Sequence, residues 1–250
     1  MSSGPQSGVR NGQQCATSPT QWRAYCALVR WDWVREMKKK TTLISMGVMG
    51  LITLFLFSFA IPISSTKAEI LEDTRAGILW VTFLFAATIG IDRAFRNDAE
   101  SGLLEGLLLA PVERMTLYFA RVTSTLLFVV TLQGFLFVLF LVLFNQSISG
   151  EGLWGLIVSA IATDVGFVTI GVLISAMTWS LPGGDVMLRI LLFPMLLPIL
   201  NVTVEIADRA FDGRAPTAQQ LGMLFAVDAL FLGAGSLLFE HLVNDSGGSS

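Results

Sequence analysis

The sequence predicts an all-α integral membrane protein with six transmembrane helices. Hydrophobic residues make up 53% of the 250 residues, charged residues only 14%, and the mean hydropathy is +0.68. These values are unlike those of a water-soluble domain. A helix needs about 20 largely apolar residues to cross a hydrocarbon core of roughly 30 Å. Six apolar runs have about this length, and we expect spans at about 43–63, 77–91, 117–144, 153–181, 187–204 and 221–240.

The two ends of the chain differ in composition from the region between them. Residues 1–19 are rich in Ser, Gly, Gln and Pro, residues 244–250 are similarly polar, and both have little to bury, so we expect disordered tails there. Residues 20–243 form a single membrane domain in this interpretation. The first apolar run is too long for the core of a cleavable signal peptide, so it is expected to remain in the mature protein.

Residues 20–40 predict an amphipathic helix that precedes the first span. Its apolar face carries Trp22, Tyr25, Cys26, Val29, Trp33 and Met37. The Trp content and the following Lys run favour an interfacial helix, with the apolar face in the headgroup region and the lysines near anionic lipid. The alternative is a helix that packs against a neighbouring span.

Basic residues are distributed unevenly between the segments that connect the spans. If the N-terminus is cytoplasmic, twelve Lys and Arg lie on the inner side and four on the outer side. This asymmetry predicts that both termini are cytoplasmic. Neither Cys15 nor Cys26 has the spacing of a metal site, and we expect no disulfide on that side. Nothing in the sequence indicates a nucleic-acid partner.

A charged stretch, residues 89–115, separates the second and third runs. Asp98 and Glu100 suit the start of a helix, leucines follow, and Pro111 ends it. We expect a short amphipathic helix at 98–110. A solvated loop is the alternative, but a loop does not need leucines at 103, 104, 107, 108 and 109, whereas a helix that docks into a groove of another protein does.

These residues resemble a known class of transporter. Gly102, Leu104, Glu105, Leu107 and Pro111 match the cytoplasmic coupling helix of ABC-2 type permeases. Residues 76–122, with the Gly-Ile-Leu-Trp entry to the second span, are similar to the CcmB family of the cytochrome c maturation system. So are residues 182–200, with their Gly-Gly turn and their proline pair. The resemblance extends over roughly residues 20–243, a single CcmB-like permease domain.

The sequence departs from the family pattern in three places. Asp164 occupies a usually uncharged position, the loop before the fifth span lacks a basic pair, and the N-terminal tail is longer than usual. None of these differences touches the coupling helix.

The resemblance implies the ABC-2 permease fold and a role in c-type cytochrome biogenesis, either in haem export or in ATP-driven release of a haem chaperone. It also implies the inner (cytoplasmic) membrane as location. The implied partners are a separate CcmA-like ATPase, a CcmC-like haem-handling membrane subunit and a small accessory subunit. An ABC-2 exporter for a saccharide, lipid or drug, or a non-transporting assembly scaffold, remains an alternative.

The sequence indicates no enzyme and no resident cofactor. It lacks the G-x-x-x-x-G-K-[ST] phosphate loop, so ATP belongs to the partner chain and haem enters only as a possible substrate. His241 is the only His, which excludes a bis-His haem site within the chain. We expect no catalytic or metal-binding residue. The expected ATPase-coupling residues are Asp98, Glu100, Gly102, Leu104, Glu105, Leu107, Leu108 and Pro111.

Two pairs of residues inside the apolar runs are further candidates. Pro194 and Pro198 each remove a helical hydrogen bond, so they are expected to bend or unwind the fifth span, either as a static kink or to line a groove. Asp164 and Asp228 lie near mid-bilayer, where a carboxylate costs on the order of 3 kcal/mol. For Asp164 the small neighbours favour a groove or a partner interface. For Asp228 we favour a neutral acid bonded to Thr163, Thr169 or backbone.

Overall fold

The computed structural model describes residues 18–60, 67–100, 114–146, 148, 150–178 and 183–246. Within these ranges the secondary structure is entirely helical. The seven described helices are α1 (Ser18–Lys39), α2 (Thr41–Ala60), α3 (Lys67–Glu100), α5 (Arg114–Leu143), α6 (Gly150–Thr178), α7 (Gly184–Phe211) and α8 (Ala218–Ser246). Six of them, all except α1, are long and apolar enough to cross a membrane. For the described residues, the all-α class and the number of candidate spans, six, are therefore confirmed.

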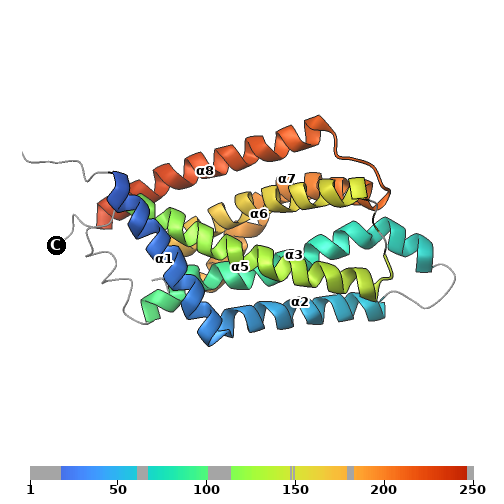
Figure 1. The fold of residues 1–250 in the computed structure, drawn as a ribbon, viewed down its shortest axis with the longest axis horizontal. Helices are drawn as coiled ribbons and strands as arrows, with labels where there is room; N and C mark the ends of the chain where they lie inside the picture. The colour runs from blue at the N-terminus through green and yellow to red at the C-terminus, as the bar shows by residue number, and fades with distance from the viewer. Residues whose placement is uncertain are drawn as a thin grey trace, which may run out of the picture.

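The six long helices form one elongated bundle, and α1 crosses it obliquely (Figure 1). The start of α1 and the end of α8 lie at the same end of the bundle, which we call the α1 end. The starts of α3, α6 and α8 lie at the opposite, far end. The first and the last helix meet at one end because six helices, an even number, run back and forth along the bundle.

Helix α6 is the centre of the bundle. It packs against α3, α5, α7 and α8. Of its most apolar 18-residue segment, 78% is buried, whereas the corresponding segments of α2 and α8 are each only 22% buried. Small residues allow this crowding: a Cβ on Gly166 or Gly171 would overlap side chains of α8 or α3. The outer helices α2 and α8 turn most of their apolar residues away from the bundle, as expected for surfaces in lipid or against other membrane subunits.

Two helices run well beyond the expected spans. Helix α3 exceeds 77–91 at both ends because hydropathy marks only the part that suits a membrane, while Glu, Lys and Arg continue the helix in water. Helix α7 exceeds 187–204 and begins after Gly183, whose φ of 75° is a left-handed conformation that favours glycine. Residues 244–246, expected in the C-terminal tail, belong to α8.

Helices α1 and α2 meet at a sharp joint. Lys40 alone separates them and has a φ of 54°. Glu36 stabilises the joint, because its Oε1 accepts a 2.7 Å hydrogen bond from the backbone N–H of Thr42. This side chain caps the start of α2, where backbone N–H groups lack helical partners.

Candidate functional site

The expected coupling helix begins at the end of α3. Asp98 and Glu100 lie in the last turn of α3 rather than at the start of a separate helix. The remaining coupling candidates lie in residues 101–113, outside the described part of the chain: Gly102, Leu104, Glu105, Leu107, Leu108 and Pro111. The coupling helix therefore stays a prediction. The structure adds that α3 leads directly to this segment, and that 67% of the most apolar 18-residue segment of α3 is buried.

A buried ion pair holds α1 against the bundle. Arg121 of α5 donates a 2.8 Å hydrogen bond from Nη1 to Oδ1 of Asp32, and both side chains are only 7% exposed. Burial of a charge is costly unless it is paired, so each of these residues requires the other. The pair joins α1 to the first turns of α5.

Two further contacts continue this attachment along α1. The Tyr25 hydroxyl is 2.7 Å from Oγ1 of Thr123, and the Trp33 ring stacks on Phe128 with ring centroids 5.2 Å apart. The alternative that we gave for residues 20–40, packing against a span, is thus present in the structure. An interfacial position for the rest of the helix, including the 67% exposed Trp22, stays a prediction.

Two hollows border α1. The first is a polar cavity of about 50 Å³ between α1, α2, α3 and α5, lined by the Asp32–Arg121 pair together with Arg35, Glu36 and Arg93. The second is an open apolar groove of about 460 Å³ between α1 and α5, lined by Tyr25, Cys26, Val29, Arg30, Trp33 and Leu127. Only the open groove approaches the several hundred Å³ typical of organic ligand sites.

The two acids expected near mid-bilayer occupy opposite faces of α6. Asp164, 3% exposed, lies on the face toward α3 and α7 and lines a cavity of about 20 Å³. Asp228 of α8, 5% exposed, lies against the backbone of Gly166 on the other face. Both carboxyl groups are thus enclosed within this chain.

The small residues beside Asp164 also have partners inside the chain. Thr163 and Thr203 of α7 are joined by a 2.7 Å hydrogen bond between their hydroxyls, and Gly166 makes room for Asp228. The side chain of Gln133 from α5 lies next to Asp164. The structure therefore brings Asp164, Thr163 and Gln133 together in the interior, while a role for Asp164 or Asp228 in a groove or partner interface stays a prediction.

The proline pair lies on the outer face of α7. Pro194 and Pro198 are exposed, whereas Leu192, Leu196 and Ile199 of the same helix are buried. The helix continues through both prolines without unwinding. Because proline lacks an N–H, the carbonyls one turn earlier, at Ile190 and Pro194, lose their usual donors. A bend that serves transport stays a prediction.

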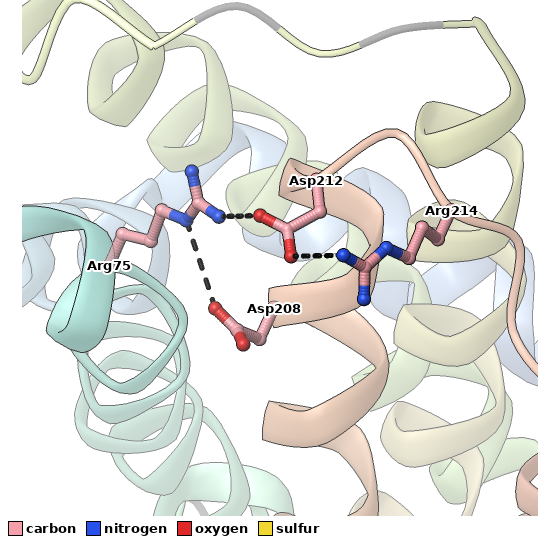
Figure 2. A network of polar contacts seen from close by, with 4 residues as sticks. All are labelled: Arg75, Asp208, Asp212 and Arg214. Carbon is pink, nitrogen blue, oxygen red and sulfur yellow. Dashed lines mark hydrogen bonds and ion pairs between the residues drawn. The ribbon is translucent and has the colours of Figure 1, made fainter.

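A cluster at the far end was not apparent from the sequence. Arg75 of α3 lies between Asp208 of α7 and Asp212, the residue directly after α7 (Figure 2), at 3.8 Å and 2.5 Å respectively. Its guanidinium also lies 5.1 Å from the ring centroid of Phe211, and Arg214 reaches the other oxygen of Asp212 at 3.9 Å. We call these five residues the Arg75 clasp. The available signal was the four-residue spacing of Asp208 and Asp212, which puts two acids on the same side of the last turn of α7 and its C-cap.

Comparison with known proteins decides the family. Residues 23–242 match the family model described as CcmB protein. The chain belongs to the CcmB family. It is therefore a multi-pass membrane permease and not an enzyme, as the resemblance in residues 76–122 and 182–200 implied.

Curated relatives from three bacteria carry the name heme exporter protein B. The Pseudomonas aeruginosa protein is 27% identical over 184 residues, which cover 72% of this chain and 78% of the relative. The Rhodobacter capsulatus protein is 30% identical over 172 residues, or 66% of this CcmB chain and 76% of the relative. The Haemophilus influenzae protein is 26% identical over 193 residues, which cover 76% of this chain and 84% of the relative.

Proposed function

We propose that this CcmB-family chain is the permease subunit of an ABC complex for c-type cytochrome biogenesis, working in haem export or in ATP-driven release of a haem chaperone. The observation that carries the proposal is the family match over residues 23–242 together with six candidate spans. The name of the relatives, heme exporter protein B, supports haem as the substrate.

In this proposal ATP is bound and hydrolysed by a separate CcmA-like ATPase, and the chain itself holds no resident cofactor. The ATPase docks on the segment after α3, with Leu104, Leu107 and Leu108 in an apolar groove and Glu105 against a basic group. The long, largely buried α3 favours this site, because a displacement of its end is transmitted into the bundle core. A CcmC-like subunit, a small accessory subunit and lipid complete the proposed surroundings.

We place the chain in the inner (cytoplasmic) membrane with both termini in the cytoplasm. The start of α1 and the end of α8 share the α1 end of the bundle (Figure 1). Arg93 and Arg121, and the basic run at residues 38–40, lie at that same end. Retention of basic residues on the cytoplasmic side supports this orientation.

Cavity sizes favour a haem path outside the interior of this chain. Among the described residues, three cavities between the helices have volumes of about 50, 20 and 10 Å³, far below the several hundred Å³ typical of organic ligand sites. We propose that haem moves along the outer surface of this subunit, between it and another subunit. The exposed apolar face of α7 is one such surface.

Glu105→Lys tests the coupling role. We expect the variant chain to insert normally but to bind the ATPase less and to stimulate ATP hydrolysis less, because the substitution places a cation opposite a basic group. Glu151→Lys is the matched control, since Glu151 is exposed in the first turn of α6 at the far end. Unchanged assembly and turnover for Glu105→Lys would remove the coupling role.

The two candidate activities differ in what ATP drives. Complex purified through a tagged chain and placed in vesicles is supplied with haem, haem chaperone and ATP. ATP-dependent haem flux supports export, whereas chaperone release without flux supports the scaffold function. Co-purification of an ATPase and a haem-handling membrane protein is expected in both cases. Co-purification of saccharide or lipid enzymes in their place would favour the other ABC-2 exporters.

A further inference from the structure

Several buried side-chain polar atoms of the described residues have no hydrogen-bond partner, among them Nε2 of Gln133, whose side chain lies beside the Asp164 carboxyl. Two others are Nε1 of Trp80, on α3, and Oδ2 of Asp164, on α6. Each residue is only 3% exposed. Buried polar groups in folded proteins are nearly always paired, so two such atoms in one place call for a ligand.

Both side chains line the same cavity. Its volume is about 20 Å³ and most of its wall is apolar, including Phe83, Phe167 and Ile199. A cavity must offer roughly 10–15 Å³ to hold one water molecule. The cavity between α3, α6 and α7 therefore has room for one water and for nothing much larger.

A third polar group completes the wall. Thr203 uses its only hydroxyl proton in a 2.7 Å bond to the carbonyl of Ile199. In the 2.7 Å contact between Thr163 and Thr203, Thr163 must then be the donor. Thr163 is also one of the residues that line the cavity, and its Oγ1 is left as an acceptor.

We propose that Trp80, Thr163 and Asp164 bind one water molecule in this cavity. The indole N–H donates to the water oxygen, and the two water protons go to Asp164 Oδ2 and Thr163 Oγ1. One donor and two acceptors match the three hydrogen bonds that a buried water typically makes. The water joins α3, the helix that leads to the proposed coupling segment, to the central helix α6.

Radiolytic hydroxyl labelling read by mass spectrometry tests this site, because radicals formed from a bound water oxidise the side chains beside it. The protein is the full chain in its complex. The probes are Phe83 and Phe167, which line the cavity, and the control is Phe231, which is as buried as Phe83 at 6% exposure. We expect both probes to be labelled several-fold faster than Phe231. Equal slow labelling of all three would overturn the proposal.

Two variants show whether the polar groups hold the water. Trp80→Phe removes the donor and keeps an aromatic ring, and Asp164→Leu removes an acceptor; each is expected to abolish fast labelling of Phe167. Asp164→Asn keeps an acceptor oxygen, so Phe167 is expected to be labelled as fast in this variant as in the unchanged protein. If Asp164→Leu fails to fold, Trp80→Phe decides the question. Fast labelling of Phe167 that persists in Trp80→Phe would show that the proposed site does not bind the water.

Discussion

At the scale of single residues, the contact between Gly166 and Asp228 sets the spacing of α6 and α8. A Cβ on Gly166 would overlap the Asp228 carboxyl and press on Ile199. We expect Gly166→Ala to destabilise the protein by about 1–3 kcal/mol, the usual cost of forcing extra atoms into a packed interior. Thermal unfolding in detergent, followed through the loss of monodisperse protein, measures this change.

Gly134→Ala is the matched control for that substitution. Gly134 also lies inside a span, but no atom lies within 4 Å of a Cβ placed there. Alanine is the better helix former by roughly 0.5–1 kcal/mol, so this variant is expected to keep or slightly raise the melting temperature. If Gly166→Ala also raised the melting temperature, this would show that α8 moves freely away from α6.

The Asp32–Arg121 pair is a second single-residue test. Asp32→Ala leaves Arg121 buried without its partner carboxylate, and loss of one member of a buried pair costs about 3–5 kcal/mol. We expect faster proteolysis of α1 and a lower melting temperature. The double variant Asp32→Leu with Arg121→Met removes both charges and is expected to recover most of the stability. A stable Asp32→Ala variant would show that the pair does not hold α1.

At the scale of the helices, local sequence and distant contacts differ in how well they can be predicted. The six spans were predictable because hydropathy and helix period are properties of short windows. The partners of the charged residues were not, because Asp32 and Arg121 are 89 positions apart and Arg75 and Asp212 are 137 apart. The inward position of Asp164 likewise depends on how α3 and α7 pack on α6.

The two prolines of α7, Pro194 and Pro198, allow the shape of this whole helix to be tested. Replacing Pro194 and Pro198 with Ala restores two backbone donors on the exposed face of α7, where no core packing is disturbed. We expect the variant to fold with equal or greater stability but to mature c-type cytochromes less well, because removal of the bend that we expect from the two prolines changes the surface offered to a partner or substrate. The assay is haem-stained cytochrome c in cells. Leu197→Ala, exposed on the same face, is the control, and full maturation by the Ala pair would show that the bend is dispensable.

The Arg75 clasp joins α3 to α7 at the far end (Figure 2). Arg75→Ala removes two ion pairs and the Phe211 contact, and it is expected to lower the melting temperature. Arg75→Lys is expected to keep only part of the stability that Arg75 gives, since an ammonium group lacks the planar, forked donors of a guanidinium. Arg214→Ala is the control, because its side chain is 67% exposed and exposed ion pairs contribute about 0–1 kcal/mol. Equal melting temperatures for Arg75→Ala and Arg214→Ala would contradict a stabilising clasp.

At the scale of the whole molecule, the orientation of the bundle decides which end meets the ATPase. Twelve of the sixteen Lys and Arg residues lie in segments assigned to the α1 side, so this end is expected in the cytoplasm. Cys26, exposed on α1, is a natural reporter there. In a Cys15→Ser background, a membrane-impermeant maleimide is expected to label Cys26 only after the inner membrane is opened.

The far end provides the opposite reporter. Glu151→Cys in a background without Cys15 and Cys26 places an exposed thiol in the first turn of α6. Intact spheroplasts are expected to expose this thiol to the reagent, because the far end faces the outer side in our orientation. If intact spheroplasts label Cys26 and spare Glu151→Cys, the α1 end faces outward. The segment after α3 would then lie on the side without ATP, and the proposed docking of an ATPase on Leu104, Glu105 and Leu107 would fail with the orientation.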